Sequence, residues 1–291
     1  MKSINHLLGN SQRNVTFHEM ICLIIVFVAI FYSLFGSWLI SFPADQVVPQ
    51  DELVAPFESY QHILGTDVYG RDLLDVFLLG IHKNYLVAIV IVLLDLFLII
   101  PLALVFGFYF RKEGIIRSLT APLTVFVSLF YYFVLIALFG PSLFIAASSV
   151  CLYIFIYTFH SIYRDVVQVM DSTMVRHLLL DGATFKQILR LVLLPTLIDK
   201  ISRQIRRVLL LVVAELILIG VLQQGISPTS VYWGNVMYQA WLYQEQTPYA
   251  LFIITCLVSI VLYATFVIFK LIEELVKESM QREREKLSQA I

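Results

Sequence analysis

The stretch Asp171–Arg207, DSTMVRHLLLDGATFKQILRLVLLPTLIDKISRQIRR, is basic and helix-forming, and it lies between strongly apolar runs. Residues 171–173 offer N-cap chemistry for a first short helix. Gly182 permits a turn or a helix C-cap, because glycine adopts positive φ without a Cβ penalty. Thr184 can cap a second helix, which Pro195 is predicted to end. The stretch therefore predicts two short helices around a glycine.

The second of these helices has one apolar face. Its residues recur at positions i, i+3, i+4 and i+7, and they are Phe185, Ile188, Leu189 and Val192. Polar and basic residues fill the opposite side. A helix of this kind can lie across a membrane surface or bind in a groove of another protein.

Composition indicates an integral membrane protein. The chain of 291 residues is 59% hydrophobic and 14% charged, whereas soluble domains carry roughly 25% charged residues. Its three cysteines lie in apolar runs, which indicates buried thiols and no disulfide framework. The net charge of −1 gives no indication of nucleic-acid binding.

Six apolar segments are candidates for membrane spans, each needing roughly 20 residues. They are Ile21–Ile40, Tyr85–Phe110, Leu119–Phe139, Ser142–Tyr163, Val208–Leu222 (extended on its N-terminal side) and Tyr249–Phe269. The predicted fold class is thus an all-α integral membrane protein with six transmembrane helices. Pro101 is expected to bend the second of them.

The distribution of lysine and arginine predicts the orientation. With both termini in the cytoplasm, only Arg71 and Lys83 of the 20 basic residues fall outside, and the Asp171–Arg207 stretch is cytoplasmic. The outer loops are then Ser41–Lys83, which is acidic, and Gln223–Thr247, which is aromatic.

Several function classes lack support in the sequence. Gly65–Asp72 has the G-x-x-x-x-G frame of a phosphate-binding loop, but Arg71 and Asp72 stand where Lys and Ser/Thr are required. The H-E-x-x-H and G-x-S-x-G motifs are absent, and no cluster predicts a metal site. An enzyme with its own catalytic centre, or a chain that hydrolyses ATP itself, is therefore disfavoured.

Two acids, Asp95 and Glu215, lie within predicted spans. A charge at mid-membrane costs about 2.5–3.5 kcal/mol on insertion scales, so such residues face a bundle interior or a water-filled path. Either acid can line a translocation path. The alternative is a structural hydrogen bond, an ion pair or a protonated carboxyl.

Three motifs together resemble the membrane permeases of bacterial ABC importers of the dipeptide, oligopeptide and nickel class, specifically their C-type permease. Leu64 to Asp72 is similar to the family's L-G-T-D-x-x-G-R-D motif in the first outer loop. The spacing from Gly182 to Pro195 resembles the G-A-S … L-P half of the cytoplasmic coupling motif. Glu215 with the later Trp233-Gly234-Asn235 resembles the fifth span and the loop after it. The resemblance covers the chain from about His62 to the sixth span.

The resemblance implies a type I importer permease fold with a cytoplasmic coupling helix between helices 4 and 5. It implies contact with ATPases through Arg176, His177, Gly182, Ala183, Thr184, Phe185, Ile188, Leu189, Leu194 and Pro195. It gives the outer-loop motif as Gly65, Thr66, Asp67, Gly70, Arg71, Asp72, Trp233, Gly234 and Asn235. Where the family has Glu-Ala-Ala, this chain has Arg176-His177-Leu178, so the ATPase contact is altered or co-adapted.

The implied partners are a homologous second permease, two cytoplasmic ATPases, an extracytoplasmic substrate-binding protein and membrane lipids. No cofactor is expected on this chain, because ATP and Mg²⁺ belong to the ATPases. The implied cargo is a peptide, nickel or a metallophore complex, and the implied location is the bacterial cell membrane.

The expected organisation has three parts. Residues 1–83 hold an N-terminal cytoplasmic segment, the first span and the outer loop; residues 84–272 hold five helices with the coupling loop 164–207; residues 273–291 form a cytoplasmic tail. The alternative function is a stand-alone secondary transporter or channel, for which inverted repeats would be expected and none is evident.

Overall fold

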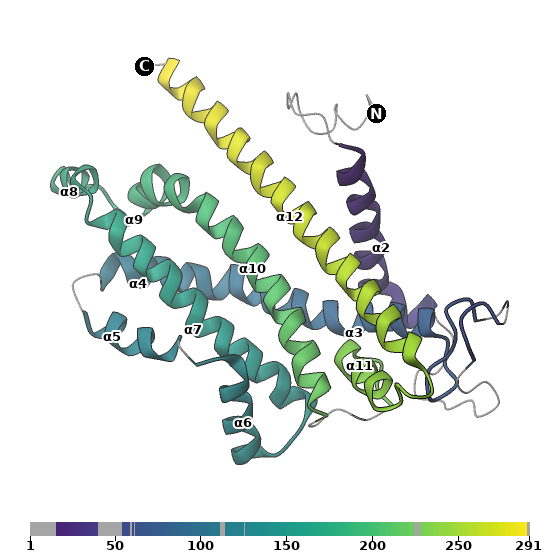
Figure 1. Ribbon diagram of the computed structural model, residues 1–291. Helices are drawn as coiled ribbons and strands as arrows, with labels where there is room; N and C mark the ends of the chain where they lie inside the picture. The colour runs from purple at the N-terminus through teal and green to yellow at the C-terminus, as the bar shows by residue number, and fades with distance from the viewer. Residues whose placement is uncertain are drawn as a thin grey trace.

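The computed structural model describes residues 16–39, 54–58, 60, 62–110, 114–124, 126–223, 227 and 229–289. These residues form helices and connecting turns, without a named strand among them (Figure 1). The helices are α2 Phe17–Leu39, α3 Leu73–Leu94, α4 Ile100–Tyr109, α5 Gly114–Leu123, α6 Ser128–Phe139, α7 Leu143–Met170, α8 Thr173–Leu180, α9 Phe185–Ile188, α10 Leu194–Val221, α11 Trp233–Leu242 and α12 Pro248–Gln289. Two π-helical turns join neighbours into longer helices: η2 Asp95–Ile99 links α3 to α4, and η3 Leu189–Leu193 links α9 to α10.

Four of the six predicted spans coincide with helices that are long and apolar enough to cross a membrane. They are Phe17–Gly36, Leu73–Tyr109, Leu143–Met170 and Pro248–Ser279. Helix α10 has the required length, but arginines at 203, 206 and 207 and Glu215 make its sequence less apolar. The structure thus supports a multi-spanning helical membrane protein, and the count of six remains a prediction.

The predicted third span, Leu119–Phe139, is wrong as a single helix. Instead, two helices cover this segment, α5 and the 12-residue α6, and their axes run in different directions (Figure 1). Pro122 lies in the last turn of α5, where its missing N–H and fixed φ favour a helix end. The apolar composition alone did not reveal this break.

The predicted second span begins too late, at Tyr85. The helix already starts at Leu73, because the Asp72 carboxylate caps it by accepting from Leu74 N at 2.7 Å and Asp75 N at 3.3 Å. The first outer loop therefore ends at Asp72, not at Lys83. The predicted boundaries at residues 84 and 273 both fall inside continuous helices, α3 and α12.

Both prolines inside long helices directly follow a π-helical turn. Ile100 N–H bonds to Asp95 O just before Pro101, and Leu194 N–H bonds to Leu189 O just before Pro195. A proline ring clashes with the preceding turn of a regular α-helix, and a widened π turn relieves that clash. The prediction that Pro195 ends the second helix of the basic stretch is therefore wrong, because the helix continues from Phe185 to Val221.

The described helices enclose two large apolar cores, and a small third cluster joins Cys22 and Val26 of α2 to Ala264 and Ile268 of α12. The first core joins α2, α3, α6, α7, α10, α11 and α12, with Trp233, Ile154 and Leu216 among its most buried members. The second core joins α4, α7, α8, α9 and the start of α10, through residues such as Val166 and Leu193. Helices α7 and α10 belong to both and so connect them.

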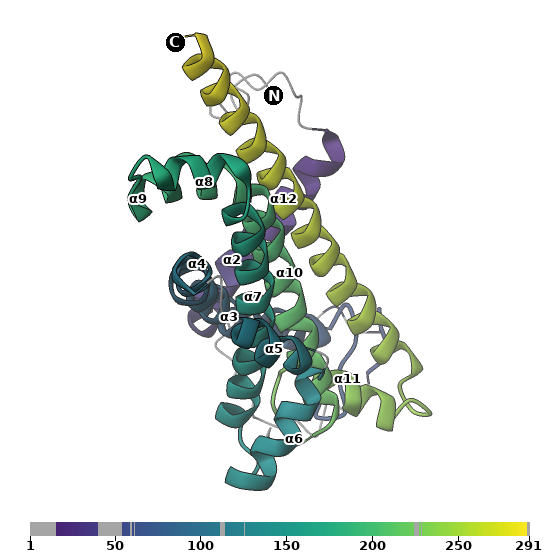
Figure 2. The ribbon, with the colours of Figure 1, turned by 90° about the vertical axis from the view of Figure 1, so that its left-hand side faces the viewer.

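The two cores lie toward different ends of the molecule. Helices α8 and α9, the start of α2 and the end of α12 share one end, which we name the α8 end (Figure 2). Helix α11 lies toward the opposite end, which we name the α11 end (Figure 2). The charge distribution predicts that the basic stretch and both termini share one side of the membrane, and this arrangement agrees with that relation. Which side is cytoplasmic stays a prediction.

Candidate functional site

Helices α8 and α9, with the turn of residues 181–184 between them, form an exposed bend at the α8 end, which we call the elbow. Ser172 caps α8 by accepting from Val175 N at 3.4 Å. After α8, Gly182 has φ +81° and donates to Leu179 O at 3.2 Å, while Ala183 N donates to Leu178 O at 2.9 Å. This pair of bonds is the Schellman motif that glycine at this position favours. The predicted turn at Gly182 is confirmed.

Helix α9 starts as the sequence predicts. Gln187 Oε1 accepts from Thr184 N at 2.7 Å and from Thr184 Oγ1 at 2.9 Å, so the cap residue and the third residue of the helix hold each other. Thr184 is therefore the N-cap of this helix. The turn between the two helices of the elbow spans only the residues 181–184.

The apolar face of α9 points into the chain itself. Ile188 is fully buried and Val192 is 6% exposed, both within the second core. Phe185 packs against Phe108 of α4, with ring centroids 4.9 Å apart. The expectation that this face binds a partner needs correction for Ile188, because its side chain already contacts this chain on all sides.

The elbow presents other side chains outward. Leu180 is 83% exposed and Met174 is 60% exposed, while Arg176 and His177 on the same helix are also exposed. Sequence reasoning missed Met174 and Leu180. The signal in the sequence is the apolar spacing i, i+3, i+4 of Val175, Leu178 and Leu179, which predicts the inward face of α8 and so leaves Arg176, His177 and Leu180 outside it.

Leu194 and Pro195, the other predicted coupling residues, lie where η3 passes into α10. Leu194 is 38% exposed, and the π turn before it packs Val192 and Leu193 into the second core. These two residues thus connect the elbow to the long helix α10. Their predicted role toward an ATPase stays a prediction.

Glu215 lies on α10 beside a group of hydroxyl side chains from α6 and α7. Its carboxylate accepts a hydrogen bond from Ser128 Oγ, and it interacts electrostatically with Tyr153. Tyr153 in turn lies 6.4 Å from Tyr131 and 6.0 Å from Tyr157, measured between ring centroids. Ser128, Tyr131, Tyr153, Tyr157 and Glu215 form what we call the acid–tyrosine cluster. Glu215 and the tyrosines 153 and 157 are half-buried, so a polar flank of the bundle remains partly open.

Asp95, the other candidate for the path, is fully buried within the chain. It belongs to the π turn η2, and Thr158 of α7 faces its carboxyl. Its position differs from that of Glu215, because the bundle of this one chain already encloses it. The geometry therefore favours Glu215 over Asp95 as a residue that lines a path.

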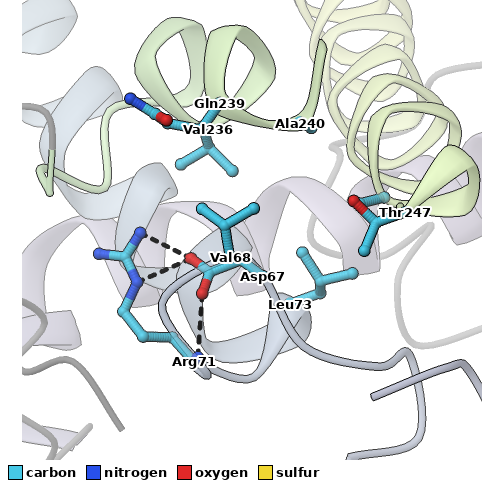
Figure 3. A pocket seen from close by; sticks show the side chains of 9 residues that line it. Asp67, Val68, Arg71, Leu73, Val236, Gln239, Ala240 and Thr247 are labelled. Carbon is cyan, nitrogen blue, oxygen red and sulfur yellow. Dashed lines mark hydrogen bonds and ion pairs between the residues drawn. The ribbon is translucent and has the colours of Figure 1, made fainter. Parts of the chain in front are cut away.

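The outer-loop motif, Gly65–Asp72, folds into a compact hydrogen-bonded loop at the start of α3, and we use the name knot for this loop (Figure 3). Asp67 Oδ2 accepts from Arg71 Nε at 2.7 Å, and Asp67 Oδ1 accepts from the backbone N–H groups of Tyr69 and Arg71, each at 2.9 Å. Both side chains of this ion pair are less than 10% exposed. The Arg71 guanidinium also donates to Thr229 O, so the knot binds the first outer loop to the second.

Other motif residues complete the same knot. Thr66 Oγ1 accepts from Val54 N at 2.8 Å, and His62 Nδ1 lies 3.0 Å from Asp72 Oδ2. Gly65 and Gly70 have φ of +81° and +73°, and a Cβ on Gly65 would lie 2.6 Å from Val54 O. Burial raises the pKa of the Tyr69 phenol, so that side chain stays neutral beside the ion pair.

A small hollow lies beside the knot, between it, α11 and α12. It is lined by Asp67, Val68, Arg71, Leu73, Val236, Gln239, Ala240, Thr247 and Ala250, most of which Figure 3 labels. The cavity of about 10 Å³ has room for roughly one water molecule, so the hollow does not hold a peptide.

The second outer-loop motif, Trp233-Gly234-Asn235, packs α11 against α3 and α10. Trp233 is fully buried, stacks on Phe77 at 5.6 Å and donates from Nε1 to Phe77 O at 3.1 Å. Asn235 Nδ2 donates to Ser227 O at 2.7 Å. A Cβ on Gly234 would lie only 1.9 Å from Ile217 O, so α10 and α11 meet in backbone contact there.

Comparison with known proteins agrees with these motifs. No protein-family model matches the chain. The peptide transport system permease protein SapC of Salmonella typhimurium is 26% identical over 212 residues, which cover 70% of this chain and 71% of the relative. The SapC protein of Escherichia coli O6:H1 is 26% identical over 209 residues, with 70% and 71% covered.

The matched length and the apolar helices identify a multi-pass protein of the bacterial cell membrane. Within the described residues, no group of three or more His, Cys, Asp or Glu side chains gathers as a metal site would require. The chain is thus similar to the SapC peptide transport permeases over 70% of its length, which agrees with the permease resemblance of its outer-loop and coupling motifs.

Proposed function

We propose that the chain is the transmembrane permease subunit of an ATP-driven peptide importer. It forms one half of a translocation path together with a homologous second permease. A substrate-binding protein delivers the cargo from outside, and two separate cytoplasmic ATPases supply the energy. Peptides are favoured over nickel or a metallophore complex, because the relatives are named as peptide transport permeases.

The elbow formed by α8 and α9 is the observation that carries this proposal. It stands at the same end of the molecule as the end of α12 (Figure 2). It exposes Leu180 and Met174, beside the exposed Arg176 and His177. Exposed apolar side chains on a short helix are typical of a protein contact. We infer that they contact an ATPase, with Arg176 and His177 at the rim.

The inward face of the elbow provides a route for movement. Ile188 and Val175 lie in the second core together with Val166 of α7 and Leu104 of α4. Because packed side chains transmit displacement rather than absorb it, a shift of the elbow would move α4, α7 and α10 together. This is the motion that an importer needs between inward-open and outward-open states.

The acid–tyrosine cluster supports a path along the flank of α6, α7 and α10. A half-buried carboxylate and phenol groups are costly against lipid, and a second permease or water-lined cargo would satisfy them. We therefore propose Glu215 as a path residue. The neutral, isosteric change Glu215→Gln should alter uptake; uptake equal to wild type at every pH would show that the residue is structural.

A mild-detergent purification of the tagged chain from its native membrane tests the assembly. Mass spectrometry should find a second permease and two ATPase subunits, and the sample should hydrolyse ATP. Recovery of the chain alone, without ATPase activity, together with uptake by the purified chain in vesicles, would favour the alternative of a stand-alone transporter.

Leu180→Asp tests the contact itself. The aspartate should reduce ATPase co-purification and uptake at least tenfold, because it places a charge in an apolar contact, while the chain still reaches the membrane. Ser279→Asp is the matched control, since Ser279 is exposed at the last position of the apolar segment Pro248–Ser279 of α12. Equal loss in both variants, or no loss in Leu180→Asp, would contradict the contact.

A further inference from the structure

Asp95 is a fully buried acid whose carboxyl oxygens lack an ordinary hydrogen bond. Its side chain is 0% exposed, and neither oxygen has a partner of normal hydrogen-bond geometry within the described structure. The group that faces the carboxyl is the Thr158 hydroxyl of α7. Asp95 is the first residue of the π turn η2, and Asp95 and Ile99 are the buried residues of that turn.

The polar groups near Asp95 come from α7 and, behind Thr158, from α10, and none of them is a cation. From α7 come Thr158 and the Cys151 thiol, which interacts electrostatically with Asp95. From α10, Gln204 donates through Nε2 to Thr158 Oγ1 at 2.9 Å, and Gln204 itself is 3% exposed. Among the described residues, no Lys, Arg or His forms an ion pair with Asp95.

Other acids of this chain show what Asp95 lacks. Asp165, on the same helix as Thr158, has Lys200 Nζ at 3.1 Å. Glu273 Oε2 lies 2.8 Å from Arg206 Nη1. Glu215 has the Ser128 hydroxyl and is partly exposed. Asp95 alone of these four is enclosed without a cation or open solvent.

We propose that Asp95 is a proton-binding site that holds a neutral carboxylic acid in the closed bundle. An unpaired charge in such an enclosed place is far costlier than uptake of a proton, which converts the carboxylate into a neutral group. The acid O–H or carbonyl then completes a chain of polar groups from η2 through Thr158 to Gln204. This inference does not depend on the proposed function.

The position of the site links the proton to the packing of the bundle. Asp95 is the first residue of the π turn that precedes Pro101. Ile99 of the same turn belongs to the second core, which also contains the inward-facing Val175 and Ile188 of the elbow. Ionisation requires water or a cation to reach the carboxyl. The proton is therefore retained only while α7 stays packed against η2.

Infrared difference spectroscopy tests the proposal directly. The full chain, purified with the subunits that accompany it and placed in lipid nanodiscs, should show the C=O stretch of a protonated carboxylic acid near neutral pH. This band should disappear in Asp95→Asn, which keeps the size and polarity of the side chain. It should persist in Glu215→Gln, the matched change at the other intramembrane acid.

A second variant keeps the test decisive if Asp95→Asn folds poorly. Thr158→Val removes the hydroxyl that faces Asp95 and should shift the frequency of the same band. Absence of a protonated-acid band in the wild-type chain would overturn the proposal. So would a band that neither Asp95→Asn nor Thr158→Val changes, because the proton would then belong to another residue.

Discussion

The knot at the α11 end and the elbow at the α8 end both carry motif residues, but they use them in opposite ways. In the knot, Asp67 and Arg71 are buried and paired with each other, and Trp233 is enclosed by α3. In the elbow, Arg176, His177 and Leu180 face outward. A motif held inward by its own chain stabilises the fold, whereas a motif held outward on a rigid turn is available to another molecule.

Gly234→Ala should break the α11 end most severely. The new Cβ would lie 1.9 Å from Ile217 O, and backbone cannot move aside as a side chain can. We expect a loss of more than about 4 kcal/mol in the free energy of unfolding, or no folded protein. The yield and the midpoint of thermal unfolding in detergent measure this.

Gly182→Ala is its control at the α8 end. A Cβ there has no neighbour within 4 Å, and only the φ of +81° is strained, at a cost of about 1–2 kcal/mol. If both alanine variants unfold at the same temperature, the two ends do not differ in the way that we infer.

Arg71→Met should be the next most damaging change. It leaves the buried carboxylate of Asp67 without its cation, which typically costs about 3–5 kcal/mol. The double variant Asp67→Asn with Arg71→Met should lose less than the single one, because no unpaired charge remains. Thermal unfolding of the two single variants and the double variant measures the coupling. Strict additivity would contradict a direct pair.

Thr184→Ala should weaken the elbow by a smaller amount. It removes the hydroxyl that bonds to Gln187 Oε1 at the start of α9, a loss of about 0.5–2 kcal/mol. Faster hydrogen exchange of the α9 amides, with little change in the global unfolding midpoint, is the expected result. Thr196→Ala, at an exposed position of α10, provides the control. Equal exchange in the two variants would show that the cap is unimportant.

Leu180→Asp should have the smallest effect on stability. Its side chain is 83% exposed, so the unfolding free energy should change by less than about 0.5 kcal/mol. Combined with the loss of ATPase contact proposed above, this would separate binding from folding. Destabilisation as large as that of Arg71→Met would show that the two ends are held alike.

Much of the elbow could be predicted from local chemistry. Gly182 and Thr184 act within a few residues of themselves, through a positive φ and a helix cap, and both predictions are confirmed. The membrane class followed from composition, since apolar runs of that length have few other uses. In these cases the physical cause and the residues that reveal it lie in one short segment.

Other features depended on partners distant in the sequence. Pro195 does not end its helix, because the π turn η3 relieves its clash while Val192 and Leu193 pack into the second core. The sequence does not show that the apolar face of α9 is already covered by this chain, because Ile188 is buried by residues of α4 and α7 in the second core.

The sequence by itself determined the membrane class, the helix caps and the turn at Gly182, because these follow from composition and from contacts within a few residues. Tertiary structure alone decided that Arg71 reaches Thr229, that Trp233 reaches Phe77, and that Asp95 is enclosed while Glu215 remains partly open. Side-chain burial and long-range hydrogen bonds depend on how separate helices meet, and no local pattern encodes that meeting.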